Sequence, residues 1–418
     1  MKINSRNTCR ISNNKLEELW DLGNLYISDF LDEKNIEAPK APLRLGIGHE
    51  SELIQLMDTA DQDSLYRQYW YLSGVNQTMT KQLKDIVDIV PNWVRLKEND
   101  IVLDIGCNDG TLLNHYDKNL GLKKYGIDPA KNLSEIAKKN LDFYACDYFN
   151  KETFLNLSNE KKAKVITSIA MFYDLEDPNL FAQDIKASLD SNGIWIIQLS
   201  YTPLMFFQNA FDNILHEHIE YYTLKTLDYI MKKNGLKILD AELNNTNAGS
   251  IRLVITHESN DIKDVALYDK EVGDLRYKSI LNFEEKNLSN IRDAFISFSK
   301  RINNIKDETL NLLNDIKSKG KKVLGYGAST KGNTLLQYYG ITSDLIELIA
   351  ERQEQKYNKY TAGSWIKIIS ESEMRKIKPD YLFILPWHFS SEFLHREKTL
   401  LDNGTKFIIP LPELKIIS

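Results

Sequence analysis

The sequence has few cysteines, no long apolar run and no block of basic residues. Its three cysteines, Cys9, Cys107 and Cys146, are widely spaced and odd in number, which argues against a disulfide framework and indicates a reducing compartment. The most apolar stretches, residues 194–199 and 381–387, are far too short to span a bilayer and are typical of buried strands. No apolar segment follows the charged N-terminal residues, so no signal peptide is expected. We therefore expect a cytoplasmic protein without a membrane partner.

Charges of both signs are spread along the chain. The 59 acidic and 53 basic residues give a net charge of −6, and without a basic patch nucleic acid is not expected as the main partner. Hydrophobic residues at 42% and charged residues at 27% are typical of a soluble globular protein. A chain of 418 residues is too long for one ordinary core, so we expect two or three domains. The sequence does not establish the oligomeric state, and we favour a monomer.

The order of apolar runs and helical patterns predicts an α/β fold. Residues 1–80 contain prolines and glycines and no sustained period, so an irregular N-terminal domain is expected. From residue 81, a helical pattern at 82–90 is followed by buried strands that alternate with helices. Such alternation predicts a doubly wound, Rossmann-like sheet. Its expected strands are 101–105, 124–127, 165–169 and 193–199.

The second half of the chain repeats this architecture after a helical connection. Residues 261–320 are rich in charged residues, have apolar residues at helical spacing and predict long solvated helices. A second Rossmann-like sheet is then expected, with a helix from Thr330. The predicted domains are residues 1–80, 81–260 and 261–418. The strands expected in the second sheet are 322–325, 345–350, 381–385 and 406–409.

The strongest local motif is Asp104-Ile-Gly-Cys-Asn-Asp-Gly110, at the end of an expected strand. Glycines such as Gly106 let backbone amides approach a ligand closely before the next helix, expected near Thr111. The next strand ends in Asp128, about twenty residues on, the spacing of an acid that binds ribose hydroxyls. The motif lacks the Gly-x-Gly-x-x-Gly spacing of a pyrophosphate site, so we favour S-adenosylmethionine over a dinucleotide. Residues 146–149, which include Asp147 and Tyr148, would lie near the adenine.

Two further motifs suggest chemistry. His216-Glu217-His218 lacks the spacing of a zinc protease, but two imidazoles and a carboxylate suit proton abstraction. The alternative is a polar loop whose histidines bond to the backbone. The Gly325–Gly332 turn, with Lys331 at a helix N-terminus, predicts a phosphate site. Its alternative is a nicotinamide dinucleotide site, which would make the protein an oxidoreductase. Aromatic residues 66–73 are interpreted as packing.

Together these segments resemble the sugar C-methyltransferases of deoxysugar biosynthesis over nearly the whole chain. Those proteins have a cysteine-rich N-terminal domain, a central S-adenosylmethionine domain and a Rossmann-like C-terminal domain. Several motifs in the same order are more specific than any single one. The segments that carry the resemblance are 71–77, 106–113, 216–222, 247–252, 325–332, 385–389 and 407–410.

The resemblance implies methylation of carbon 3 of a nucleotide-linked 4-keto-6-deoxyhexose, with S-adenosyl-L-methionine as cofactor. A base removes the acidic proton beside the ketone, and the enolate carbon attacks the methyl group. The base would be His218, with Glu217 assisting, His216 orienting and Tyr71 near the sugar. The cofactor would meet Asp104, Gly106, Asn108, Gly110, Asp128, Pro129, Asp147, Tyr148 and Gln77. The sugar nucleotide would meet Tyr222, Asn247, Tyr326, Ser329, Lys331, Asn333, Trp387 and His388.

The chain departs from this family in three places. The family binds zinc through two Cys-x-x-Cys pairs, which here read Cys9-Arg-Ile-Ser12 and Gly48-His-Glu-Ser51, so no metal is expected. Leu215 replaces a common tyrosine. Residues 171–175 (Met-Phe-Tyr-Asp-Leu) replace a segment that often carries another histidine. A binding module that has lost catalysis is the third alternative, and the presence of Glu217 and His218 argues against it.

Overall fold

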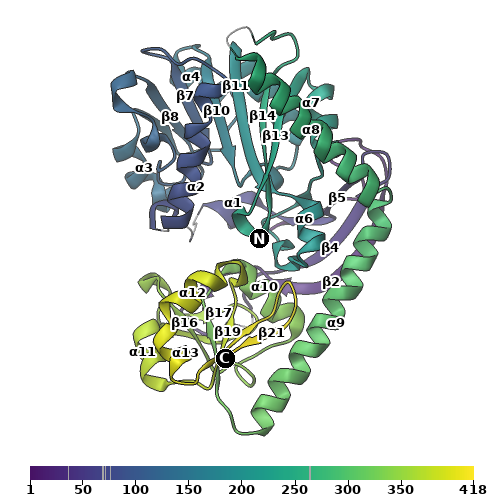
Figure 1. Ribbon diagram of the computed structural model, residues 1–418, viewed down its shortest axis with the longest axis vertical. Helices are drawn as coiled ribbons and strands as arrows, with labels where there is room; N and C mark the ends of the chain where they lie inside the picture. Colours follow the sequence, from purple (N-terminus) through teal and green to yellow (C-terminus); the bar gives the residue numbers. More distant parts are fainter. Residues whose placement is uncertain (36, 68–69, 71, 76, 263–264) are drawn as a thin grey trace.

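The computed structural model describes residues 1–35, 37–67, 70, 72–75, 77–262 and 265–418. It consists of two large α/β lobes with a smaller β-structure between them (Figure 1). Among the described residues, no helix is both long enough and apolar enough to cross a membrane.

The N-terminal part is more regular than the sequence predicted. Its main sheet pairs β2 (Leu16–Tyr26), β4 (Lys40–Gly48) and β5 (Leu53–Leu56) in antiparallel fashion, and β1 (Ile3–Ser5) pairs with β6 (Asp58–Ala60). Along β4, Leu43, Leu45 and Ile47 alternate into the core, as a strand with one buried face requires. Pro42 pairs at a register irregularity, where its missing N–H is tolerated. The prolines and glycines therefore did not mark an irregular segment.

The central sheet has seven strands in the order β13-β14-β11-β10-β7-β8-β9. Parallel pairing joins five of them, and the expected strand 101–105 is found without change as β7. The helix expected near Thr111 is wrong, because two 3₁₀ turns, Leu113–His115 and Lys118–Leu120, lie between β7 and β8. The strands are β7 (Ile101–Ile105), β8 (Lys123–Ile127), β9 (Phe143–Ala145), β10 (Ala163–Ile169), β11 (Leu189–Ser200), β13 (Leu236–Asn244) and β14 (Ser250–His257).

Helices flank this sheet and bury its apolar residues in two clusters. The carboxyl ends of β7, β8 and β10 lie at one edge, where open α/β sheets bind their ligands. The helices are α2 (Gln77–Asp88), α3 (Ser134–Asn140), α4 (Lys151–Ser158), α5 (Pro178–Ser188), α6 (Thr202–Phe207) and α7 (Leu224–Lys233).

The expected helical connection consists of α8 (Leu267–Asn287) and α9 (Ile291–Ser318). Helix α8 packs on β13 of the central sheet, and α9 runs along one side of the molecule to the second lobe (Figure 1). A helix of this length spans about 42 Å at 1.5 Å per residue. The apolar face of α9 packs on β2 and β15, so this helix contacts both the N-terminal part and the C-terminal lobe.

The C-terminal lobe contains an eight-stranded sheet in the order β21-β20-β19-β15-β16-β18-β17-β3. Its central strands are parallel, and α10 (Thr330–Tyr339) begins at the predicted residue. The strands are β15 (Val323–Tyr326), β16 (Leu348–Glu351), β17 (Tyr360–Thr361), β18 (Lys367–Ser370), β19 (Tyr381–Ile384), β20 (Lys406–Ile409) and β21 (Lys415–Ile417). The remaining helices are α11 (Glu371–Ile377), α12 (Ser390–Arg396) and α13 (Lys398–Asp402).

Two short strands tie the three parts together. Strand β3 (Phe30–Leu31), from the N-terminal part, forms the edge of the C-terminal sheet by pairing with β17. Strand β12 (Glu220–Tyr221), from the central part, pairs with β5 of the N-terminal sheet. The His216-Glu217-His218 motif lies directly before β12, so all three parts meet around it.

Candidate active site

A cavity of about 370 Å³ lies at the carboxyl edge of the central sheet, large enough for a small-molecule cofactor. Most of the residues predicted for the cofactor line it. Gly110 and Gln77 are not part of its lining, and Gln77 is exposed at the start of α2. The predicted residues that do line the cavity are Asp104, Gly106, Asn108, Asp128, Pro129, Asp147 and Tyr148.

The turn after β7 has the close-approach geometry that its glycines suggested. Gly106 and Gly110 have φ of +71° and +80°, and Asn108 between them has φ of 52°. The Asn108 amide donates to Asp128 Oδ2 at 2.8 Å, and its side-chain oxygen accepts the Ser73 amide at 3.0 Å. The turn is therefore held between the end of β8 and the N-terminal segment.

Two buried carboxyls mark the ends of neighbouring strands. Asp104, at 4% exposed, accepts a 2.6 Å hydrogen bond from Thr167, and burial raises its pKa to about 7. Asp128 accepts the amides of Asn108 and Ala130, both at 2.8 Å, and burial raises its pKa as well. Each Asp128 oxygen keeps a lone pair for a further donor. These acceptor oxygens fit the two hydroxyl donors of the ribose of an adenosyl group.

The sequence did not predict what covers the cavity. Gln62 and Tyr66 of α1 (Gln62–Tyr66) line it from the N-terminal part, and the Tyr66 hydroxyl donates to the Glu217 carbonyl at 2.7 Å. Arg67 stacks over the ring of Tyr148 at 4.8 Å. One short helix thus contacts both the cofactor cavity and the His-Glu-His loop. The only sequence signal was an aromatic cluster that we interpreted as packing.

His216 is held by the backbone. It is 3% exposed, and its Nε2 lies 3.0 Å from the carbonyl oxygen of Ala41 in β4. Burial lowers its pKa to about 4, so the ring is neutral at pH 7. A neutral imidazole must donate here to be bonded to a carbonyl. His216 thus fixes the loop against the N-terminal sheet.

His218 has a different environment. Its Nδ1 lies 3.0 Å from the carbonyl oxygen of Asn213, which assigns the ring proton to Nδ1 and leaves Nε2 with a free lone pair. The ring contacts Tyr173, with centroids 4.2 Å apart. Burial, reinforced by the charge of Lys331, lowers the pKa of His218 to about 3. Burial raises the pKa of the neighbouring Glu217 to about 7, with Asp29 adding to the rise and Lys331 opposing it.

The C-terminal lobe places a cation beside this loop. Lys331 Nζ donates to Asn213 Oδ1 at 2.6 Å, and burial lowers its pKa, opposed by the charges of Asp212 and Glu217. The indole of Trp387 donates to Asp212 Oδ2 at 3.1 Å. Burial and Lys331 together lower the pKa of His388 to about 3. The structure therefore brings Glu217 and His218 together with Lys331, Trp387 and His388.

The turn after β15 is a helix cap. Ser329 caps α10 by accepting the Gly332 amide at 3.0 Å, and Gly327 has φ of +84°. Asn333 is 1% exposed, and neither polar atom of its side chain has a partner among the described residues. Tyr326 is buried, with its hydroxyl 2.8 Å from carboxylates of both Glu371 and Glu397. Its hydroxyl is thus occupied within the lobe.

Two further predicted residues are described by the structure, and one is not. Tyr222 is fully buried and donates to Glu220 at 2.7 Å. Asn247 has φ of 50° in the turn before β14. Tyr71 lies outside the residues that the structure describes.

The four positions aligned with zinc ligands form a closed hydrogen-bonded corner. Cys9 Sγ lies 3.1 Å from Ser51 Oγ, and a Cβ on Gly48 would lie 2.8 Å from Cys9 Cβ. Burial alone would raise the pKa of Cys9, but hydrogen bonds with Ser12 and Ser51 outweigh it and lower the pKa. In the described part of the chain, no three His, Cys, Asp or Glu side chains are grouped to hold a metal ion.

Two family models match the chain in succession. A methyltransferase domain matches residues 75–241, and a C-methyltransferase C-terminal domain matches residues 245–412. The second match begins before β14, so it includes one strand of the central sheet as well as the C-terminal lobe. With the cavity described above, these matches define an S-adenosyl-L-methionine-dependent methyltransferase.

One curated relative extends over most of the chain. It is the C-methyltransferase NovU of Streptomyces niveus, 25% identical over 378 residues, or 90% of this chain and 88% of that protein. These matches support a C-methyltransferase, and the motifs of the chain resemble those of sugar-modifying C-methyltransferases.

Solved structures of methyltransferases are similar to less than half of the chain. A methyltransferase from Clostridium acetobutylicum is 15% identical, with a TM-score of 0.33 over 43% of this chain and 92% of its own. Magnesium protoporphyrin IX methyltransferase from Synechocystis is 14% identical, with a TM-score of 0.35 over 44% of this chain and 88% of its own.

Proposed function

We propose that this C-methyltransferase acts on carbon 3 of a nucleotide-linked 4-keto-6-deoxyhexose through an enolate. The observation that carries the proposal is the position of His218. Its Nδ1 is engaged by the Asn213 carbonyl, so Nε2 is the basic atom, and Lys331 of the other lobe lies beside the same loop. Forming a carbanion beside a ketone needs a neutral base and a nearby positive charge for the developing oxyanion.

His218, Glu217 and the cofactor cavity have separate roles in this reaction. Nε2 of His218 takes the proton from carbon 3, and the electron pair of that C–H bond moves toward the ketone oxygen. The low pKa of His218 keeps the imidazole unprotonated at pH 7. Glu217, whose pKa is about 7, positions the sugar beside the base. The cofactor, when bound, supplies an electrophilic methyl group from the cavity lined by Asp104 and Asp128.

The sugar nucleotide would bind where the C-terminal lobe contacts the loop that carries His218. The N-terminal turn of α10 presents amides and the Lys331 ammonium, which suit a diphosphate. Asn333 is a candidate to contact this ligand, because its side chain is buried and has no partner among the described residues. Trp387 and His388 follow from the neighbouring strand β19, so they would lie near the nucleotide.

The test is a product assay. Purified enzyme with S-adenosylmethionine should transfer one methyl group to a nucleotide-linked 4-keto-6-deoxyhexose, and the product spectrum should show the new methyl on carbon 3. A matching 4-hydroxy sugar nucleotide should not react, because it has no ketone to acidify the neighbouring C–H bond. Methyl transfer to oxygen, or to the 4-hydroxy sugar at an equal rate, would refute the enolate route.

A further inference from the structure

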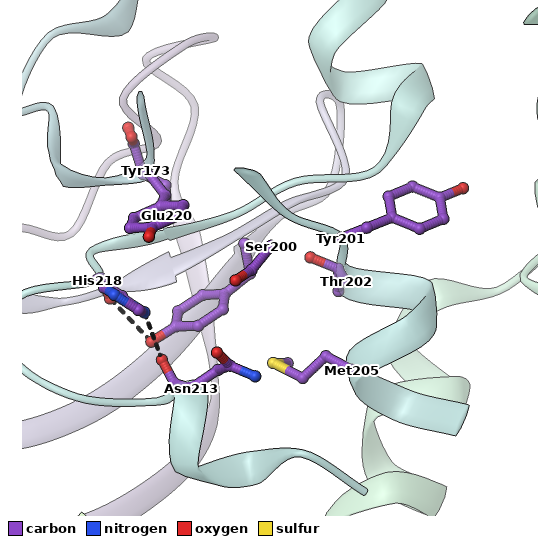
Figure 2. Close-up of a pocket in the computed structure, with 9 residues that line it drawn as sticks. Tyr173, Ser200, Tyr201, Thr202, Met205, Asn213, His218 and Glu220 are labelled. Carbon is purple, nitrogen blue, oxygen red and sulfur yellow. Dashed lines mark hydrogen bonds between the residues drawn. The ribbon is translucent and has the colours of Figure 1, made fainter. Parts of the chain in front are cut away.

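A second, much smaller cavity lies beside His218. Its volume is about 10 Å³, which is room for one water molecule. It lies between the end of β11, the start of α6 and the loop from Asn213 to Tyr221 (Figure 2). None of the steps proposed above uses it.

Three side-chain oxygens at this cavity have no hydrogen-bond partner within the described parts of the chain. They are Ser200 Oγ, Thr202 Oγ1 and Glu220 Oε1. Thr202 and Glu220 are each only 2% exposed, so bulk water does not solvate them. Buried polar groups in folded proteins are nearly always hydrogen-bonded, and three exceptions around one small cavity point to a shared partner.

The backbone keeps this cavity from collapsing. The Thr202 amide donates to the Tyr222 carbonyl at 3.0 Å, which fixes the start of α6. Glu220 lies in β12, whose pairing with β5 fixes its main chain. Glu220 Oε2 accepts the Tyr222 hydroxyl at 2.7 Å, and Oε1 remains 4.0 Å from Arg10 Nε. The main chain that carries Thr202 and Glu220 is therefore fixed on two sides of the cavity.

We propose that this cavity binds one water molecule, hydrogen-bonded to Ser200 Oγ, Thr202 Oγ1 and Glu220 Oε1. Three polar partners are the usual number for a buried water, and the volume excludes anything much larger. A metal cation is disfavoured for two reasons. Burial raises the pKa of Glu220 to about 8, so its carboxyl is mostly neutral at pH 7, and Lys331 already supplies positive charge beside His218.

This water has a consequence for catalysis that rests on the proposed function. The His218 ring is held by Asn213 at Nδ1 and by Tyr173 at its face, and it also borders the cavity (Figure 2). A bound water fills the cavity beside the ring, so the ring cannot tilt into that space and Nε2 stays aligned with carbon 3. Ser200, Thr202 and Glu220 are thus positioning residues, since they act on the base through the water.

A high-resolution crystal structure tests the site without any assumption about substrate. We expect one electron-density peak within about 2.7–3.2 Å of all three oxygens. An empty cavity would overturn the proposal. So would a peak with several contacts of about 2.3–2.6 Å, which is the geometry of a calcium ion rather than water.

A pair of matched variants tests the role. Thr202→Val removes the hydroxyl without changing the side-chain shape, whereas Thr202→Ser keeps it. Thr309→Val is the control, because Thr309 also carries a buried hydroxyl without a partner among the described residues, but lies in α9 outside both cavities.

We expect Thr202→Val to lose the water and to slow exchange of the carbon 3 hydrogen by roughly tenfold or more, with unchanged binding of S-adenosylhomocysteine. Thr202→Ser and Thr309→Val should retain wild-type exchange. Wild-type exchange in Thr202→Val, with the water lost, would refute the positioning role. If wild-type enzyme itself shows no exchange, the proposed function fails, and the crystal structure still decides whether the water is bound.

Discussion

Lys331 Nζ lies 2.6 Å from Asn213 Oδ1, and this hydrogen bond joins the C-terminal lobe to the loop that carries His218. The backbone carbonyl of the same Asn213 accepts His218 Nδ1 at 3.0 Å. One residue therefore orients the candidate base and the nearest lysine of the other lobe. A substrate that displaces Lys331 from Asn213 would therefore affect the residue that orients the His218 ring.

We expect Lys331→Ala to raise the Michaelis constant for the sugar nucleotide without changing cofactor affinity. A charge-assisted hydrogen bond is worth roughly 1.5–3 kcal/mol, which corresponds to about a tenfold to hundredfold change. Lys317→Ala, an exposed lysine at the end of α9, is the control. Steady-state kinetics with an unchanged Michaelis constant would rule out a diphosphate contact. A change in NADH fluorescence on adding protein would instead support the oxidoreductase alternative.

Substituting Asp128→Ala should weaken binding of S-adenosylhomocysteine. The carboxylate lies at the end of β8 in the cofactor cavity, and its loss removes the expected acceptor of the ribose hydroxyls. A hydrogen bond to a charged group is worth roughly 1.5–3 kcal/mol. Calorimetry should therefore show roughly a tenfold to hundredfold rise in the dissociation constant. Asp307→Ala, on the exposed face of α9, should bind normally. Equal affinity in both variants would remove Asp128 from the cofactor site.

The N-terminal part should fold without zinc. Its core contains Leu43, Leu45, Leu53 and Leu56, all fully buried, and Gly48 leaves no room for a second thiolate beside Cys9. Metal analysis of untagged protein should find far less than one zinc per chain, and a chelator should leave the melting temperature unchanged. One zinc per chain, or unfolding by the chelator, would contradict this prediction.

The free energy of unfolding should fall at acidic pH, because His216 is buried in its neutral form. Its pKa is about 4 in the folded state, against about 6.5 for an exposed histidine. The unfolded chain therefore binds more protons between these values. The contribution of a neutral, buried His216 is complete above pH 6.5 and is lost as the pH falls toward 4. The expected loss is on the order of 3 kcal/mol.

Urea unfolding of wild type and His216→Asn isolates this effect, because the other titrating groups are shared. The free energy of unfolding of wild type should fall more steeply than that of the variant between pH 6.5 and 4. Parallel curves would show that His216 is not buried in its neutral form.

The strands that carry the cofactor site were predictable because each combines a short apolar run with a terminal acid or glycine. Residues 101–105 are an example, since β7 is buried along its whole length and ends at Gly106. The N-terminal sheet was missed because Pro42 and the glycines of β4 resemble loop residues locally. Their tolerance depends on pairing with β2, which is a tertiary feature.

The roles of the two histidines could not be separated by spacing alone. The two histidines differ in their hydrogen-bond partner. His216 bonds to the carbonyl of Ala41 in a distant strand, and His218 bonds to the carbonyl of Asn213 in the same loop. The residues that cover the cofactor cavity could also not be predicted, because the hydrogen bond from Tyr66 to Glu217 joins residues 151 positions apart in the sequence. The small cavity of Glu220 and Thr202 likewise depends on strand pairing, since β12 must join β5.

The most direct test of the central claim is hydrogen exchange at carbon 3 in deuterium oxide. Wild-type enzyme with S-adenosylhomocysteine and a nucleotide-linked 4-keto-6-deoxyhexose should incorporate deuterium there, because the enolate forms without methyl transfer. His218→Asn should lose exchange and methylation together, by about 10²–10⁴-fold, the usual contribution of a general base. His216→Asn should lose much less. Full exchange in His218→Asn would contradict the assignment, and its loss in His216→Asn instead would show that the roles are reversed.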